Sequence, residues 1–255
     1  GSSGFLSLGE RPKATRLKKF NDIGLQTSLQ IFYNNKIKNM RKVSLKICDI
    51  TNSQSVKTAY KNKIRSLGFA RNTLNGPNTA TDKKIQILIK ECKNYKIESV
   101  LLTRFVSLDK LIKQIDFTKP KTISCSYHFK KDELQLLRKT FKRLKIGIAV
   151  NPENFNIKYL RNIKNIVNII YYDLNVYKTK SIKTYALVKC LKQIQSIKNL
   201  SIPVFIGGGI DEEKANKIIS LLNPEGIDVS RNLKNAKNII SSKKLKNFLQ
   251  QVAVA

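Results

Sequence analysis

The chain has 255 residues, enough for one large domain or two small ones, and its 41% hydrophobic content excludes global disorder. It carries 49 Lys and Arg against 17 Asp and Glu, a formal net charge of +32. No apolar run approaches the roughly 18–20 residues that span a bilayer, so we expect no membrane insertion. Four cysteines lie far apart without a CxxC pair, which argues against a zinc site or a disulfide scaffold and indicates a reducing compartment.

The positive charge favours a polyanionic partner. An AT-rich genome enriches Lys, Asn and Ile together, but that bias does not explain the shortage of acidic residues. A field of this size and sign attracts polyanions, of which RNA and DNA phosphate are the most common. A solvated Lys-rich surface without such a partner is the simpler interpretation, and it stays open beside the first.

Residues 1–42 differ from the rest of the chain. They are Gly/Ser-rich and then basic, with nine Lys and Arg against two acids and no long apolar period. We therefore expect a basic extension with at most one short helix, around 25–33. The start at Gly is consistent with removal of a leader, but equally with a truncated chain or a tag remnant at GSSG. From the basic start without Met we expect an organelle matrix, mitochondrial rather than plastid. A cytoplasmic location is expected instead if the protein is a metabolic enzyme.

From residue 43 to 255, short aliphatic runs alternate with Lys-rich stretches of helical spacing. Eight strands alternating with helices predict a closed (β/α)8 TIM barrel, an α/β fold. Continuous apolar strands are expected because helices and the barrel interior cover both faces. The expected strands are 44–48, 64–69, 97–103, 122–126, 145–150, 167–173, 202–207 and 226–230. Helical spacing is clearest in 82–95, 107–115, 131–144 and 211–222.

Residues at the carboxyl ends of these strands could carry chemistry, because function lies at that face of such barrels. Cys48 ends the first strand and Asp173 the sixth, and a thiol and a carboxylate can serve as base and acid. Gly207–Gly209 and Ser230 follow the last two strands and predict a phosphate cradle of backbone N–H groups. Alone, a strand cysteine is usually core packing and a glycine run a tight turn. The prediction therefore depends on their joint placement.

Several of these segments resemble the phosphoribosylanthranilate isomerase family. KICDIT at 46–51 is similar to the family's KICGIT, and PVFIGGGI at 203–210 and PEGIDVSRNLK at 224–234 are similar to its closing segments. His128, the only histidine, falls on a family histidine. The resemblance spans 43–252 and is strongest at both ends. It implies a TIM barrel that needs no cofactor or metal and rearranges an aminoaldose phosphate to its ketose in tryptophan biosynthesis.

The resemblance also implies roles for individual residues. Cys48 would be the general base that takes a proton from the sugar carbon next to the imine. Asp173 would be the general acid that helps to open the furanose ring. The implied substrate and phosphate contacts are Ser181, Lys183, Gly207, Gly208, Gly209, Ser230 and Arg231.

Other positions depart from the family pattern and indicate a degenerate member. The segments 179–185 and Ser230–Asn232 lack glycines that the family uses to approach phosphate. Pro77 stands where the family has a substrate-binding arginine, and Arg71 is out of register. Asp49 replaces the glycine after the cysteine, and we expect its charge to raise the pKa of the Cys48 thiol.

Two interpretations of function stay open. One is an active isomerase that binds a phosphorylated sugar. The other is a pseudoenzyme, recruited as a basic RNA-contacting subunit beside other proteins in a ribonucleoprotein such as an organellar ribosome. From residue 43 onward 40 Lys and Arg stand against 15 acids, which suits phosphate-backbone contact and, with the lost ligand positions, favours the second. The candidate RNA contacts are Arg11, Lys13, Arg16, Lys18, Lys19, Lys139, Lys142, Arg143, Lys243 and Lys244.

Overall fold

The computed structural model describes residues 42–71, 79–103, 106–126, 128–175 and 187–254. The expected N-terminal helix, the five candidate RNA contacts before residue 20, Pro77, Ser181 and Lys183 lie outside these residues. Within the described part of the chain, no helix combines the length and the apolar character that crossing a membrane requires.

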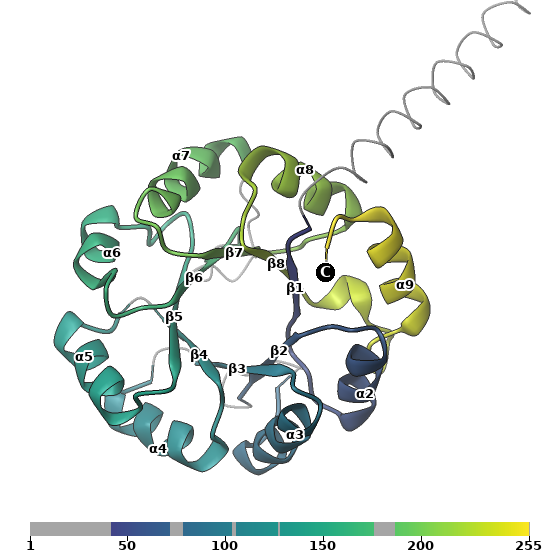
Figure 1. Cartoon of the computed structure of the whole chain (residues 1–255), viewed down its shortest axis with the longest axis horizontal. Helices are drawn as coiled ribbons and strands as arrows, with labels where there is room; N and C mark the ends of the chain where they lie inside the picture. The colour runs from purple at the N-terminus through teal and green to yellow at the C-terminus, as the bar shows by residue number, and fades with distance from the viewer. Residues whose placement is uncertain (1–41, 72–78, 104–105, 127, 176–186, 255) are drawn as a thin grey trace, which may run out of the picture. The chain divides into compact units, whose positions relative to one another are not determined.

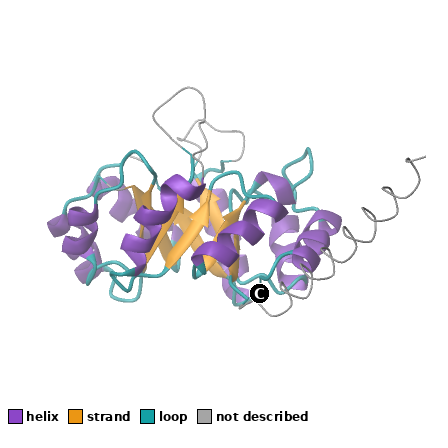
Figure 2. Cartoon of the chain, turned by 90° about the horizontal axis from the view of Figure 1, so that it is seen from above, coloured by secondary structure: helices purple, strands orange, loops and turns teal. Residues whose placement is uncertain are grey.

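Eight parallel strands close into a barrel in sequence order, as Figure 1 shows, with β1 paired to both β2 and β8. The helices lie outside the strands, and the side view in Figure 2 shows the strands tilted inside the helical layer. The expected (β/α)8 architecture is therefore confirmed. The strands are β1 Ser44–Ile47, β2 Ser66–Ala70, β3 Glu98–Leu102, β4 Thr122–Ser126, β5 Lys145–Val150, β6 Ile169–Asp173, β7 Val204–Gly207 and β8 Gly226–Val229.

The strands form where the sequence predicts them, and no end is displaced by more than two residues. All residues of β2 and β4 are buried, and the other strands have at most two partly exposed or exposed positions. Such continuous burial follows because helices cover the outer face while side chains fill the interior.

Helices follow most strands and cover the barrel. Several begin at a side chain that accepts a backbone N–H, such as Asn52 before α2 and Asp211 before α8. The helices are α2 Ser53–Lys61, α3 Asp82–Asn94, α4 Leu108–Thr118, α5 Lys131–Thr140, α6 Ile157–Ile163, α7 Leu187–Lys198, α8 Glu212–Leu222 and α9 Ser242–Gln251, with a 3-10 turn η2 at Arg231–Leu233.

Helix α5 ends earlier than the helical spacing of 131–144 predicts. Phe141 leaves the helical conformation, with φ −122° and ψ 75°, and the amide of Leu144 then donates to the Phe141 carbonyl. The last four residues of the expected helix therefore form the turn into β5. The extra apolar spacing reflects Leu144, which is buried at the start of that strand.

A lysine lies among the apolar side chains of the barrel interior. Val100, Tyr171 and Phe205 pack together there, and Lys46 is only 1% exposed. Its Nζ lies 4.9 Å from the centre of the Tyr171 ring, within cation–π range. A buried ammonium group needs an anionic or hydrogen-bonding partner, and the partners of Lys46 define the site described next.

Candidate active site

Strand β1 carries both Lys46 and Cys48 into the barrel, because alternate residues of a strand share a face. The backbone of Cys48 continues the strand pairing, since its amide donates to the Val229 carbonyl at 2.9 Å. Both side chains are buried, and Lys46 Nζ lies 2.5 Å from Cys48 Sγ. The expected position of Cys48 at the carboxyl end of the first strand is confirmed.

Asp228 on β8 completes this cluster, which we call the Lys46–Cys48–Asp228 cluster. The pairing of β1 with β8 places Lys46 opposite Asp228. The carboxylate Oδ2 accepts from Lys46 Nζ at 2.5 Å and from Cys48 Sγ at 3.1 Å. The sequence analysis did not assign Asp228 a role. Its signal was present, since it is the acid of the GIDVS segment at the end of an apolar strand.

The cluster controls the ionisation of the cysteine. Burial raises the pKa of the Cys48 thiol well above its ordinary value, and Asp228 and Asp49 raise it further while Lys46 opposes them. The expectation that Asp49 raises the pKa of the Cys48 thiol is therefore confirmed in direction, although burial and Asp228 act more strongly. The thiol is protonated near neutral pH and donates to Asp228.

Lys46 keeps its charge in this cluster. Burial alone would lower the pKa of its ammonium group, but Asp228 and Cys48 outweigh burial and raise the pKa above its ordinary value. A fixed positive charge therefore lies within hydrogen-bonding distance of both the thiol and the carboxylate. It stabilises a negative charge on either group.

Asp173 lies two strands away from Asp228, with β7 between them. It ends β6 opposite Gly207, and its Oδ1 accepts from the Asn175 amide at 2.9 Å. A Cβ added to Gly207 would lie 3.2 Å from Asp228 Cβ, and one added to Gly208 would lie 2.5 Å from Asp173 Oδ1. The end of β7 therefore fits between the two carboxylates. These glycines, predicted as a phosphate cradle, also make room for the acids.

Asp49 and the turn after β8 form a second polar cluster beside Cys48. Asp49 has a φ of 58°, a conformation that explains a glycine in the family at this position. Its Oδ2 accepts from Ser230 Oγ at 2.7 Å, and its carbonyl accepts from Lys234 Nζ at 2.7 Å. Burial lowers the pKa of Lys234, although Asp49 opposes this effect. Lys234 was missed by sequence reasoning, although it is the last residue of the PEGIDVSRNLK segment that carries the resemblance.

The remaining predicted site residues are less closely joined to this centre. Arg71 forms an ion pair with Asp82 on α3, with 2.8 Å between Nη2 and Oδ2. This ion pair engages Arg71, which therefore does not replace the substrate-binding arginine that the family has at the position of Pro77. His128 is exposed, and its Nε2 lies 3.1 Å from the Val106 carbonyl. Arg231 is exposed at the start of η2. The phosphate roles of Gly209, Ser230 and Arg231 stay predictions.

The chemically active side chains lie on four neighbouring strands in the order β6, β7, β8 and β1. Along this arc stand Asp173, the glycine turn, Asp228 and Cys48. A proton can pass between the thiol and the Asp228 carboxylate, and Asp173 can act on another part of a ligand. Within the described ranges, no group of three or more His, Cys, Asp and Glu side chains is arranged to hold a metal ion.

The chain is similar to a named isomerase over most of its length. N-(5'-phosphoribosyl)anthranilate isomerase 2 of Methanosarcina mazei is 23% identical over 215 residues, which cover 81% of this chain and 92% of that protein. The barrel is related to the phosphoribosylanthranilate isomerases. No family model matches the chain.

Solved structures support the shared fold. The isomerase of Pyrococcus furiosus has a TM-score of 0.62 and 20% identity, over 82% of this chain and 98% of that chain. KGPDC of Streptococcus mutans has nearly the same TM-score, 0.61, at 12% identity, over 83% of this chain and 99% of that chain. Proteins with different names share this fold equally well. The fold alone therefore does not indicate isomerase activity, which must be inferred from the residues of the site.

Proposed function

We propose that the barrel is an active phosphoribosylanthranilate isomerase, which converts a phosphorylated aminoaldose to the corresponding ketose. The observation that carries the proposal is the arc across β6, β7, β8 and β1. It holds the two residues that the resemblance implies as base and acid, and adds two charged partners of the thiol, Lys46 and Asp228. The relationship to the Methanosarcina mazei isomerase supports the same activity.

The reaction divides into two proton transfers. Asp173 in its protonated form donates to the furanose ring oxygen. The bond from that oxygen to the anomeric carbon breaks, and the nitrogen lone pair forms a cationic imine. The Cys48 thiolate then removes the proton from the neighbouring carbon, and the released electron pair forms a carbon–carbon double bond and neutralises the nitrogen. Tautomerisation of the resulting enol gives the ketose, so no atom or electron is gained or lost.

Cys48 must lose its proton before it can act as the base. Asp228 is the acceptor in place, at 3.1 Å from Sγ, and the Lys46 ammonium stabilises the thiolate that is left. Asp228 is thus proposed to set the proton balance of the base.

The departures from the family pattern affect ligand binding more than this chemistry. They remove glycines and one arginine but leave Cys48 and Asp173 in place. Ser230, Arg231 and Lys234 are proposed to offer polar groups where backbone donors are lost. The net charge supports the alternative function, a ribonucleoprotein subunit in the mitochondrion. No described contact within the candidate active site favours that alternative.

Turnover of the aminoaldose phosphate by the purified chain tests the proposal. Cys48→Ala and Asp173→Asn should each reduce kcat by about 10²–10⁴-fold, the usual contribution of a general acid or base. Cys92→Ala is the matched control, since Cys92 is fully buried on α3, away from the site, and should keep kcat within about twofold.

A growth assay gives the second readout. The wild-type gene should restore growth without tryptophan to cells that lack the isomerase, and the Cys48→Ala gene should not. A folded wild-type protein that neither turns over the substrate nor restores growth would refute the proposal. If the Cys48→Ala protein were as active as the wild type, Cys48 would not be the base.

A further inference from the structure

A large basic groove lies at the end of the barrel opposite the candidate active site. It opens where β3, β4 and β5 begin, between the carboxyl ends of α3, α4 and α5, and has a volume of about 1370 Å³. Pockets for small ligands usually measure roughly 300–1,000 Å³, so the groove suits a more extended ligand. The cationic side chains that line this basic groove are Lys90, Lys93, Lys96, Lys119, Lys121, Lys142 and Arg143.

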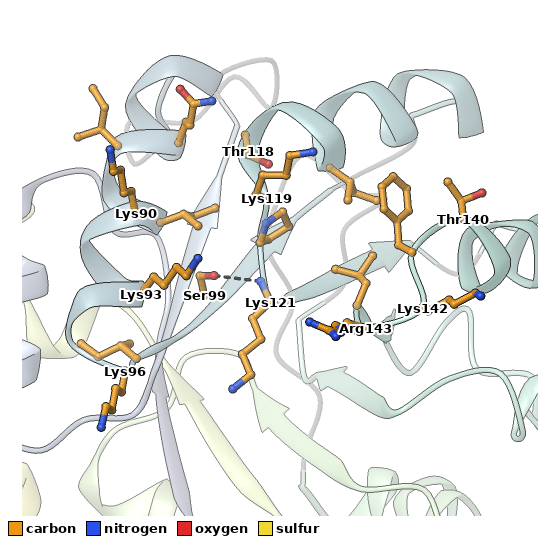
Figure 3. A pocket seen from close by; sticks show the side chains of 18 residues that line it. Lys90, Lys93, Lys96, Ser99, Thr118, Lys119, Lys121, Thr140, Lys142 and Arg143 are labelled. Carbon is orange, nitrogen blue, oxygen red and sulfur yellow. Dashed lines mark hydrogen bonds between the residues drawn. The ribbon is translucent and has the colours of Figure 1, made fainter.

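These cations come from three separate parts of the fold. Figure 3 shows the three lysines of α3 and its carboxyl-terminal turn on one side, and Lys142 and Arg143 from the turn before β5 on the other. Lys119 and Lys121 lie between them. All seven are exposed. The strands and helices of the barrel therefore bring together charges that lie up to about 50 residues apart in sequence, from Lys90 to Arg143.

Carboxylates near the basic groove are engaged elsewhere. Glu91 accepts from Ser53 Oγ at 2.6 Å, and Glu98 pairs with Lys145 at 3.2 Å. Asp116 pairs with Lys119. Among the described residues, no carboxylate lies within ion-pairing distance of the other six cations of the groove. No acidic residue lines the groove, so the charge of these six cations is left for a ligand.

Apolar side chains also line the groove. Ile87 is 59% exposed, Phe141 is half-buried, and Ile97, Pro120 and Leu144 are buried. Proteins that bind single-stranded nucleic acid combine a positively charged groove along the backbone with aromatic side chains on which bases stack. In this groove the cationic rim would contact phosphates without sequence readout, and Phe141 is the aromatic lining residue on which a base would stack.

We propose that the basic groove binds a single strand of nucleic acid through its phosphates. The proposal is independent of the isomerase activity, because the groove lies at the amino ends of the strands and the catalytic residues at their carboxyl ends. It also reduces the number of residues that we expect, from the sequence, to contact RNA. Of the five described candidates, Lys142 and Arg143 line the groove, whereas Lys139, Lys243 and Lys244 do not.

Binding of a fluorescent twelve-nucleotide uridine oligomer to the full chain tests the proposal. In the groove variant, Lys93, Lys121, Lys142 and Arg143 are each changed to Gln. We expect its Kd at about 100 mM salt to rise at least about tenfold. The slope of log K against log salt should become shallower by about 3, since each phosphate contact in a single strand contributes about 0.7.

A matched variant removes the same charge from elsewhere on the barrel. Lys57, Lys158, Lys243 and Lys246 are exposed on α2, α6 and α9, and each is changed to Gln. This variant should keep the Kd within about twofold. Thermal unfolding of both variants separates binding from helix stabilisation, because lysines near helix carboxyl ends such as Lys93 also offset the helix dipole.

Three results would overturn the proposal. Failure of the wild-type chain to bind the oligomer would exclude a nucleic-acid site. Equal weakening in the two variants would show diffuse attraction by the whole basic surface. Displacement of the oligomer by polyglutamate as effectively as by unlabelled oligomer would assign the groove to an acidic polypeptide instead. Turnover of the aminoaldose phosphate by the groove variant is measured in parallel, so failure of this proposal is distinguishable from failure of the isomerase proposal.

Discussion

Lys46 and Asp228 form a largely buried ion pair that also contacts the thiol of Cys48. Lys46 is 1% exposed and Asp228 19%, and 2.5 Å separates Nζ from Oδ2. Such a pair contributes little net stability compared with apolar residues of similar size, but removing one partner leaves the other charge uncompensated. Net stability therefore does not account for the pair, and its effect on the Cys48 thiol belongs to the proposed function.

Removal of one partner of the ion pair should destabilise the folded protein. We expect Asp228→Asn to lower the free energy of unfolding by about 3 kcal/mol, measured by urea denaturation, because Lys46 loses its anionic partner. The double variant Lys46→Met with Asp228→Asn should recover most of that loss. Equal losses in the single and double variants would contradict a coupled buried pair.

The pH dependence of catalysis should report the same cluster. In the proposed mechanism only the thiolate of Cys48 acts as base, and the pKa of the thiol is raised by burial and by Asp228. We therefore expect kcat/KM to rise with pH and to level off above the ordinary thiol pKa of about 8.5. In the Asp228→Asn enzyme the rise should move to lower pH, because a nearby negative charge is lost while Lys46 remains. An unchanged pH profile would show that Asp228 does not control the base.

At the scale of elements, the turn from β7 to α8 positions both carboxylates of the site. Gly208 and Gly209 both have positive φ, 101° and 63°. They differ in their surroundings, since a Cβ on Gly208 would meet Asp173 Oδ1 at 2.5 Å, whereas one on Gly209 would meet only Lys214 Nζ at 3.8 Å. Substitution of Gly209 therefore tests the backbone conformation alone, whereas substitution of Gly208 also displaces Asp173.

Alanine at each position tests this difference. Gly209→Ala should cost about 1 kcal/mol of stability through its backbone conformation alone and leave kcat nearly unchanged. Gly208→Ala should cost more stability, because its Cβ would also lie 2.7 Å from the Leu174 amide nitrogen, and should lower kcat by at least about tenfold, because Asp173 must move. Steady-state kinetics and thermal unfolding of the two variants measure both effects. Equal kcat values would contradict the close packing of Gly208 against Asp173.

The sequence pattern predicts strands better than helix ends. β-Branched runs such as TISCS give β4 its full length, since both faces of the strand are buried. Helix α6 has only seven residues, too few to establish an apolar period. Helix α5 ends earlier than predicted because Leu144 continues the helical spacing but is a buried residue of the turn directly before β5. Spacing alone cannot separate these two environments.

For the molecule as a whole, two functions are proposed at opposite ends of one barrel. Strand residues rise about 3.3 Å each, so a five-residue strand such as β3 separates the two ends by roughly 15 Å. At that separation the effects of substitutions are usually additive. The charged surface and the catalytic residues can therefore be changed independently.

This independence is measurable. The groove variant should keep kcat for the aminoaldose phosphate within about twofold, and Cys48→Ala should keep the Kd for the uridine oligomer within about twofold. The double combination should show both defects without further loss. Loss of turnover in the groove variant, with unchanged thermal stability, would indicate coupling between the two ends of the barrel.

The sequence by itself determined the barrel, the ends of its strands and the placement of Cys48 and Asp173 at the carboxyl face, because periodicity and strand ends are local properties. Only the tertiary structure joined Lys46 and Cys48 to Asp228, which lies 182 and 180 residues away from them. It likewise gathered the lysines of three helix ends into one groove. Closure of the barrel brings β8 beside β1 and the helix ends side by side, and no local pattern records contacts formed over such distances along the chain.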